Sequence, residues 1–260
     1  MSKHQPSRRR FLTRTAAALP VLFAVDQGTQ TDAAENLAAG DRPLKVVCVG
    51  AHPDDPESGC GGTLTRYAGA GHEVTVIYLT RGEAGIPGKS HEEAAAIRTA
   101  EAETACKILG ARPGFAGQID GATEINRERA QALLKLLTAE EPDVVFTHWP
   151  IDTHPDHQAA SLLTLRAYLA NRKRFALYFF EVNSGSQTLG FVPSAYVDIT
   201  ATRDKKLEAL QAHKSQDGER IWKEHHEIMA TFRGRELGVA AAEAFAGLAR
   251  DSRSGRLPGL

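Results

Sequence analysis

Residues 44–55 read Leu44-Lys45-Val46-Val47-Cys48-Val49-Gly50-Ala51-His52-Pro53-Asp54-Asp55. The first half of this stretch is apolar and rich in β-branched side chains, which predicts a short buried strand. Polar residues follow that strand directly, and a helix is expected over 61–69. In sheets built from such units, ligands bind beyond the carboxyl ends of the strands. The stretch therefore predicts an α/β fold and the edge of the sheet at which its site lies.

Strand and helix patterns alternate along most of the remaining chain. Further strands are expected over 74–79, 112–115, 143–147, 176–182 and 196–199. Further helices are expected over 90–110, 124–140, 155–170, 202–213, 219–232 and 239–249. This alternation predicts a mainly parallel sheet that is covered by helices on both faces. The glycine-rich fingerprints of dinucleotide and nucleoside triphosphate sites do not follow the first strand.

The overall composition is that of one globular domain. The chain has 260 residues, of which 42% are hydrophobic and 24% charged, so it can build one sizeable core. Its net charge of -1 argues against a nucleic-acid partner. Three cysteines give no paired disulfide framework. Cys48 and Cys106 are expected to be small buried hydrophobes, whereas Cys60 could pack, act as a nucleophile or bind metal as a thiolate.

The first 40 residues are interpreted as an export signal and a linker. The run Ser7-Arg8-Arg9-Arg10-Phe11-Leu12-Thr13 precedes an apolar stretch over 16–25, which is too short to span a bilayer. The paired arginines resemble the bacterial twin-arginine signal. We therefore expect the twin-arginine machinery to export the protein to the periplasm or beyond, although a disordered basic tail is the alternative. The domain is expected over 41–250, a polar tail over 251–260, and an integral membrane protein is not expected.

Two polar segments, 51–63 and 148–157, hold the residues that can carry chemistry. Both follow expected strands, so they can meet at one edge of the sheet. His52 and Asp55 lie in one turn, and His157 can face them from across the crevice. Two imidazoles and one carboxylate suit zinc and leave an open position for water. Fe²⁺ or Co²⁺ could take the same ligands.

Asp54 and His154 are placed to handle protons. Asp54 is adjacent to a ligand but points elsewhere, so it can take a proton from a metal-bound water. His154 can face the substrate, and as an imidazolium it would stabilise an oxyanion or protonate a leaving amine. The alternative for Asp54 or Asp55 is a helix N-cap. Three nearby glycines would let a helix begin close to a metal or ligand, namely Gly59, Gly61 and Gly62.

The first polar segment resembles the Ala-His-Pro-Asp-Asp-x-Glu signature of the LmbE/PIG-L family of zinc-dependent deacetylases. The second resembles the His-x-x-His ligand motif of that family, and the likeness extends over most of the domain. The resemblance implies a Rossmann-like, three-layer α/β fold. It also implies that metal-activated water removes the acetyl group of an N-acetylglucosamine-type sugar or glycoconjugate. The implied roles agree with the chemical interpretation: His52, Asp55 and His157 as ligands, Asp54 as general base and His154 as stabiliser or acid.

The same resemblance implies a set of substrate-binding residues. Glu83 lies in the loop after the second strand, Arg98 lies on the helix that follows Ser90, and Asp120 lies in a glycine-rich loop. Arg98 could instead form a surface ion pair with Glu101 on the same helix. Contacts to the sugar are thus expected from three separate loops and helices.

Other residues of the motifs have less definite roles. Asp152 and Asp156 could orient His154 or His157 from behind, or they could simply cap the helix. His213 belongs to a His-x-Ser-Gln segment that resembles a late family motif, and its role is left open. Trp149 and Phe191 could line a sugar site or belong to the core.

Three further functions fit parts of this pattern. The protein could be an exported zinc amidase that acts on another N-acyl substrate, or a non-catalytic carbohydrate- or metal-binding protein on the same fold. A two-metal phosphoesterase would need additional bridging carboxylates. The presence of both Asp54 and His154 argues against a protein that only binds.

Overall fold

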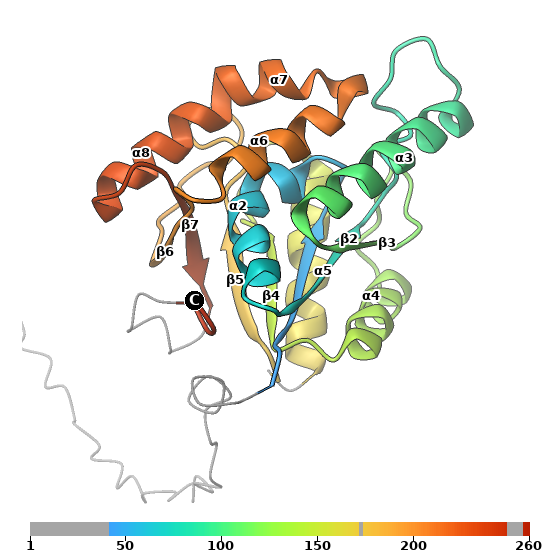
Figure 1. The fold of residues 1–260 in the computed structure, drawn as a ribbon. Helices are drawn as coiled ribbons and strands as arrows, with labels where there is room; N and C mark the ends of the chain where they lie inside the picture. The colour runs from blue at the N-terminus through green and yellow to red at the C-terminus, as the bar shows by residue number, and fades with distance from the viewer. Residues whose placement is uncertain (1–41, 172–173, 249–256) are drawn as a thin grey trace, which may run out of the picture. The chain divides into compact units, whose positions relative to one another are not determined.

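The computed structural model describes residues 42–171, 174–248 and 257–260 (Figure 1). The expected export signal and linker, and residues 251–256 of the expected polar tail, lie outside the described residues. The last four residues of that tail pack against the domain: Leu257 is buried, and the Tyr67 hydroxyl donates to the Pro258 carbonyl at 2.8 Å. Each helix in the described ranges is too short or too polar to cross a bilayer.

One seven-stranded sheet forms the centre of the domain, in the order β3-β2-β1-β4-β5-β7-β6. The five strands from β3 to β5 are parallel, whereas β7 runs antiparallel to both β5 and β6. This confirms the expected α/β fold with a mainly parallel sheet. The strands are β1 Lys45–Gly50, β2 Glu73–Tyr78, β3 Arg112–Phe115, β4 Val144–His148, β5 Ala176–Phe180, β6 Ala195–Asp198 and β7 Ala242–Gly247.

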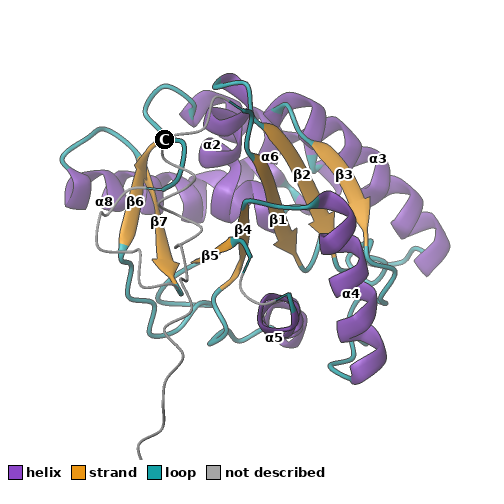
Figure 2. Cartoon of the chain, turned by 90° about the horizontal axis from the view of Figure 1, so that it is seen from below, coloured by secondary structure: helices purple, strands orange, loops and turns teal. Residues whose placement is uncertain are grey.

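Helices cover both faces of the sheet (Figure 2). Helices α2, α3 and α6 pack together on one face, and α4 and α5 pack together on the other. Figure 1 shows α7 and α8 continuing from α6 towards β7. The helical elements are α2 Asp55–Gly69, α3 His91–Leu109, α4 Arg127–Glu140, α5 Pro155–Ala170, α6 Arg203–Ala212, η1 Lys214–Gln216, α7 Gly218–Ile221, η2 Trp222–His226 and α8 Glu227–Leu237.

Strand β1 shows how the two faces obtain separate cores. Its side chains alternate between the faces, as in any strand. Val46 and Cys48 join the core beneath α2 and α3, whereas Val47 and Val49 join the core beneath α4 and α5. Because both faces are covered, the whole strand is apolar, and this is the pattern that made it recognisable in the sequence.

The helix expected over 239–249 is wrong, because Ala242–Gly247 forms β7. The alanine-rich sequence favours a helix by intrinsic propensity. In the folded chain, however, this segment is buried between β5 and β6, and it pairs with both of them. Tertiary pairing therefore overrides the local preference. The helix expected over 219–232 is also interrupted, because Trp222–His226 is π-helical between α7 and α8.

The glycines of α2 serve close packing, and not the approach of a ligand as expected. A Cβ atom on Gly59 would lie 2.2 Å from the Phe180 ring, and one on Gly62 would lie 2.7 Å from Ile199. Contacts this short are sterically forbidden, so α2 can lie directly on the sheet only with glycine at these positions. The close packing fixes the start of α2, which carries the first polar segment.

All three cysteines are free and buried. Burial raises the pKa of Cys60 well above its usual value, and the neighbouring Cys48 adds to the effect. A thiol that resists ionisation is neither a good nucleophile nor a ready metal ligand. The structure therefore favours the packing role for Cys60.

Candidate metal centre and active site

The two polar segments meet at the carboxyl edge of the sheet, as expected. Strands β1 and β4 are direct neighbours in parallel register, with Val49 beside Thr147. A pocket of about 540 Å³ opens beyond their ends. Its wall combines residues that are far apart in the sequence, including His52, Asp54, Asp55, Arg98, Asp120, His154, His157, Asn183, Gln187, Gln216, Arg220, Ile221, His225 and His226.

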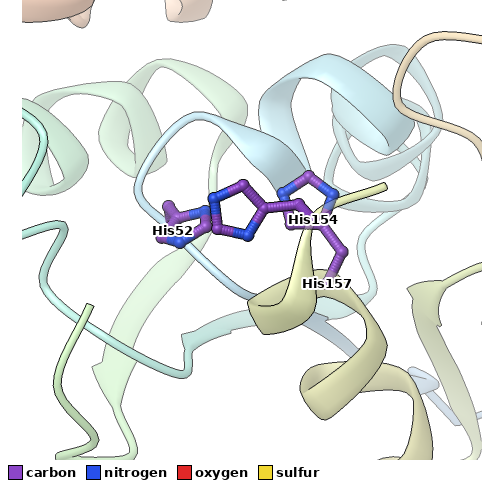
Figure 3. A group of neighbouring side chains, drawn as sticks. All are labelled: His52, His154 and His157. Carbon is purple, nitrogen blue, oxygen red and sulfur yellow. The ribbon is translucent and has the colours of Figure 1, made fainter. Parts of the chain in front are cut away.

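The carboxylate of Asp55 lies between two histidines. His52 Nδ1 is 3.1 Å from Asp55 Oδ2, and the backbone N–H of His52 donates to the same oxygen at 2.8 Å. His157 Nε2 is 3.2 Å from Asp55 Oδ1. All three side chains are buried. The structure thus brings together the three residues that the sequence predicted as ligands, and Figure 3 shows the two histidines beside His154.

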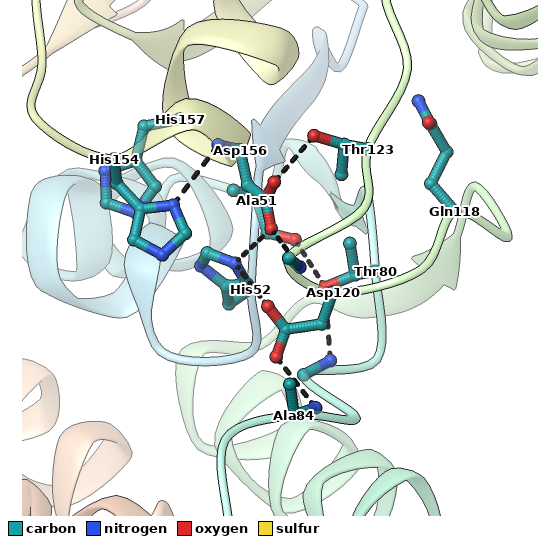
Figure 4. A network of polar contacts seen from close by, with 12 residues as sticks. Ala51, His52, Thr80, Ala84, Gln118, Asp120, Thr123, His154, Asp156 and His157 are labelled. Atoms are coloured by element: carbon teal, nitrogen blue, oxygen red, sulfur yellow. Dashed lines mark hydrogen bonds and ion pairs between the residues drawn. The ribbon is translucent and has the colours of Figure 1, made fainter. Parts of the chain in front are cut away.

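The second nitrogen of each histidine also faces a carboxylate. His52 Nε2 lies 3.0 Å from Asp156 and 3.1 Å from Asp120, and these contacts are drawn in Figure 4. His157 Nδ1 lies 3.2 Å from Asp152. A carboxylate behind a metal-binding imidazole fixes the orientation of its ring and makes it a better ligand. Asp152 thus contacts His157, one of the two histidines that it was expected to orient. The Asp156 carboxylate instead contacts His52, and not His154 or His157 as expected.

In the absence of a metal ion, these contacts favour the protonated form of both imidazoles. Burial opposes the charge on His52, but hydrogen bonds to Asp120, Asp156 and Asp55 outweigh it and raise the pKa of His52 well above its usual value. Burial is likewise outweighed at His157, where Asp55 and Asp152 raise the pKa to about 9. Metal binding at these nitrogens must therefore displace protons.

Three overlapping groups of side chains come close enough to hold a metal ion, with one atom of each member within 4.8 Å of the others. The predicted ligands are divided among these groups, since Asp55 lies between the two histidines and their rings are 5.4 Å apart. Nitrogen and carboxylate donors of this kind suit zinc or a similar transition metal. The groups are His52 with His154 and His157, Asp55 with His148 and His157, and His52 with Asp120 and Asp156.

Asp54 borders the pocket and has an unusual backbone conformation, with φ 118° and ψ -29°. The Arg98 guanidinium lies 3.2 Å from Asp54 Oδ2, and it also donates to the Pro53 carbonyl at 2.5 Å. Burial raises the pKa of Asp54 to about 6, although the positive charge of Arg98 opposes this rise. A carboxylate with such a pKa can accept a proton near neutral pH.

Arg98 is buried beneath the loop that follows β2, so the predicted alternative of a surface pair with Glu101 is wrong. Glu101 instead accepts hydrogen bonds from the backbone and hydroxyl of Ser215. A Cβ atom on either Gly82 or Gly85 would come within 2.3 Å of the Arg98 guanidinium. A side chain at either position would therefore displace the Arg98 guanidinium from the place that it occupies under this loop.

Asp120 and Glu83 form one supporting arrangement beside His52. Asp120 lines the pocket, and its carboxylate accepts the N–H of Ala84 at 3.0 Å in addition to its contact with His52. Glu83 is not among the pocket-lining residues of the described chain; its carboxylate accepts the backbone N–H groups of Asp120 and Arg81. In this structure Glu83 therefore holds the Asp120 loop in place.

His154 faces the pocket from the start of α5. Its Nδ1 accepts the backbone N–H of Asp156 at 3.2 Å, which leaves Nε2 to carry the proton of the neutral ring. Burial and the nearby His52 and His157 lower the pKa of His154. In the free protein the ring is therefore expected to act as a neutral hydrogen-bond donor, and not as the imidazolium considered from the sequence.

Several residues of the site were not singled out from the sequence. His148, at the end of β4, is fully buried; its Nε2 accepts the N–H of Ala51 at 3.0 Å and lies 3.5 Å from Asp55. Burial lowers the pKa of His148 to about 4, so it is neutral. Its position directly after the strand expected over 143–147 was the available signal. The π-helical turn η2 was also missed, and it adds His225 and His226 to the pocket wall.

The two aromatic residues considered for a sugar site lie outside the pocket. Trp149 contacts Phe179 and Phe191 edge to face, and its indole N–H donates to the Leu189 carbonyl. Both Trp149 and Phe191 pack against the core on the α4 and α5 side. Apart from histidines, the described pocket wall contains no aromatic side chain.

Comparison with known proteins agrees with this geometry. Residues 47–168 match the family model described as PIG-L, GlcNAc-PI de-N-acetylase. The diacetylchitobiose deacetylase of Thermococcus kodakarensis is 31% identical, over 76% of this chain and 81% of that protein. The chain belongs to the PIG-L family of deacetylases.

Other relatives of this PIG-L deacetylase are consistent with the assignment. The 1D-myo-inositol 2-acetamido-2-deoxy-alpha-D-glucopyranoside deacetylase of Actinosynnema mirum is 29% identical, over 67% of this chain and 81% of that protein. The solved structure of the N,N'-diacetylchitobiose deacetylase from Pyrococcus horikoshii is 28% identical and superposes with a TM-score of 0.69, covering 83% of this chain and 85% of that one.

Proposed function

We propose that this PIG-L deacetylase is metal-dependent and hydrolyses the N-acetyl group of an N-acetylglucosamine-type sugar or glycoconjugate. The observation that carries the proposal is the Asp55 carboxylate held between His52 and His157, with further carboxylates behind both rings. We assign these three residues as ligands of one zinc ion. Bound zinc lowers the pKa of a coordinated water and polarises a carbonyl oxygen.

Asp54 is the general base in this proposal. It lies next to the ligand Asp55, borders the pocket, and has a pKa of about 6, so it is ionised at neutral pH. Its contact with Arg98 keeps the carboxylate in a defined position. A general base in this position contributes roughly 10²–10⁴-fold to the rate.

His154 acts on the other side of the reacting amide. Its Nε2–H is free to donate because Nδ1 is occupied by the backbone of Asp156. A donor at this position stabilises the negative charge that develops on the acetyl oxygen. The proton that Asp54 takes from the water would pass to the departing amine. Asp120 and Arg98 border the same pocket and are proposed to contact the sugar.

The amino-sugar substrate is supported by two relatives, which are named for their action on diacetylchitobiose and on an acetamido-deoxy-glucopyranoside. The pocket wall is polar, which suits a substrate rich in hydroxyl groups. Export by the twin-arginine machinery stays a prediction from residues 1–40. It can be checked by replacing Arg9 and Arg10 with Lys and comparing the amounts of protein inside and outside the cytoplasm.

The test is acetate release from a panel of N-acetylated amino sugars and other N-acyl compounds, using zinc-loaded protein. Activity on amino sugars that disappears with a chelator and returns with zinc supports the proposal. Fe²⁺ and Co²⁺ added after chelation would identify the preferred metal. Hydrolysis restricted to non-sugar amides would support the amidase alternative, and stoichiometric sugar binding without acetate release would indicate a binding protein.

A further inference from the structure

His213 is a fully buried histidine that the proposed chemistry does not use. It follows the last residue of α6, and its Nε2 lies 3.3 Å from Oε1 of Glu57. Within the described part of the chain, neither ring nitrogen has a partner that meets hydrogen-bond geometry. Burying an imidazole without hydrogen bonds lowers the stability of the fold. We therefore ask what the contact of His213 with Glu57 contributes to the protein.

Glu57 connects His213 to the proposed general base. This side chain is fully buried in the first turn of α2. Its Oε1 accepts the Tyr78 hydroxyl at 2.6 Å and faces His213, whereas its Oε2 accepts the backbone N–H of Asp54 at 3.2 Å. Tyr78 and His213 thus orient the Glu57 carboxylate through its Oε1. That orientation in turn places Oε2 within reach of the backbone N–H of Asp54.

The backbone of Asp54 needs such support. Its φ of 118° lies in a region that residues other than glycine rarely occupy. Conformations of this kind persist only when surrounding contacts hold them. Arg98 holds the Asp54 side chain, and Glu57 holds its backbone N–H. Together these contacts set the direction in which the Asp54 carboxylate points.

The position of His213 is itself fixed by its neighbours. Ser215 donates from both its backbone and its hydroxyl to Glu101 on α3, and Gln216 Nε2 donates to the Gly85 carbonyl at 3.0 Å. These contacts attach the His-x-Ser-Gln segment to α3 and to the loop after β2. The segment therefore presents the imidazole of His213 to Glu57 at a defined place.

The local charges are consistent with this arrangement. Burial opposes a positive charge on His213, but the attraction of Glu57 and Asp54 outweighs it and raises the pKa of the imidazole. Arg98 is the other cation beside these carboxylates, and it weakens the effect. The positive charge of the His213 imidazole thus offsets the negative charge of Glu57, which is buried close to Asp54 and Asp55.

We propose that His213 is a positioning residue, which acts through Glu57 to hold Asp54 in the orientation of a general base. This inference rests on the proposed function of Asp54. It assigns a role to the late His-x-Ser-Gln segment, whose role the sequence left open. His213 does not border the pocket, so it would influence turnover without contacting the sugar.

The test compares His213→Leu with His213→Gln in the full chain. Gln can place an amide N–H near the original Nε2, whereas Leu cannot. We expect kcat of His213→Leu to fall about 10–100-fold, the usual effect of removing a group behind a catalytic residue. KM and bound zinc should stay close to those of the wild type, because sugar and metal contacts are intact. His213→Gln should recover most of the lost turnover.

Amide hydrogen exchange of Asp54, measured by NMR, provides a readout that does not depend on activity. Exchange should be faster in His213→Leu than in the wild type or in His213→Gln. His72→Gln is the matched control, because His72 Nδ1 accepts the backbone N–H of Leu44, next to the opposite end of β1. It should leave both kcat and Asp54 exchange unchanged.

Glu57→Gln keeps the proposal testable if His213→Leu fails to fold. Glu57→Gln should itself lower kcat, and in that background His213→Ala, which removes the imidazole, should cause little additional loss, because the two side chains act through one connection. Fully additive losses, unchanged kcat in His213→Leu, or unchanged Asp54 exchange would each overturn the proposal. If the wild type releases no acetate from any amino sugar, the proposed function fails, whereas Asp54 exchange still decides whether His213 holds Asp54.

Discussion

The guanidinium of Arg98 lies 3.2 Å from the carboxylate of Asp54, beneath a loop in which two glycines leave room for it. Burial raises the pKa of Asp54 to about 6, and the charge of Arg98 limits this rise. A general base works in its ionised form, so activity should fall as the pH is lowered through about 6. We therefore expect the two residues together to determine the pH below which the enzyme loses activity.

Replacing Arg98 should move that limit. Arg98→Gln removes the positive charge, so the pKa of Asp54 rises and the loss of activity begins at a higher pH. Arg98→Lys keeps a charge near Asp54 and should leave the limit closer to that of the wild type. The measurement is kcat against pH for the three zinc-loaded proteins. An identical acid limb in Arg98→Gln and wild type would show that Asp54 does not determine it.

Asp152→Asn should weaken metal binding without removing a proposed ligand. Asp152 lies 3.2 Å from His157 Nδ1, and an amide cannot replace the charge that supports this imidazole. Loss of such a partner costs about 10–100-fold in metal affinity. Competition with a fluorescent zinc chelator measures the change. Asp198→Asn changes the last residue of β6, whose carboxylate accepts the N–H of Thr200, and should bind zinc as the wild type does. If Asp152→Asn binds zinc as tightly as Asp198→Asn, the assigned role of Asp152 is contradicted.

Gly59→Ala should destabilise the fold, whereas Gly69→Ala on the same helix should not. The new methyl group at position 59 would overlap the Phe180 ring, and the one at position 69 meets open space. Overpacking in a core costs about 1–3 kcal/mol, and alanine in place of an exposed helical glycine gains up to about 1 kcal/mol. Urea denaturation measures both changes. Similar stabilities for the two variants would show that α2 can move away from the sheet.

His226 should make the folded protein sensitive to acid. Burial, together with the positive charges of Lys206 and His225, lowers the pKa of His226 well below 6.5. Below about pH 6.5 the unfolded chain binds a proton at this residue and the folded chain does not, so the free energy of unfolding falls as the pH falls. In His226→Gln this decrease should be smaller, as measured by urea denaturation at pH 7.5 and 5.5. An unchanged difference between the two pH values would exclude a neutral buried His226.

The parallel part of the fold could be predicted because each of its strands is buried on both faces. The continuous apolar run at Val46–Val49 is such a signal, and the polar residues after it mark the site. Strand β7 could not be predicted, since its small alanine side chains are compatible with a helix as well as with a buried strand. Only the pairing with β5 and β6 decides between these structures.

The site was predicted where residues close in sequence carry the chemistry. His52 and Asp55 share one turn, so their proximity follows from the motif. The positions of Arg98, His148 and His213 depend on contacts between distant segments. For example, Arg98 meets Asp54 only because α3 packs beside α2. Such contacts have no local pattern, so the sequence left the role of His213 open and gave Arg98 a surface alternative.

The backbone conformation of Asp54 places the stability of the fold in conflict with catalysis. A residue other than glycine at this φ and ψ costs about 1–3 kcal/mol. Asp54→Gly would relieve this strain, but it would remove the proposed base and leave the buried Arg98 guanidinium without its carboxylate partner. Any search for more stable variants of this enzyme that relaxes this backbone must therefore screen for turnover at the same time.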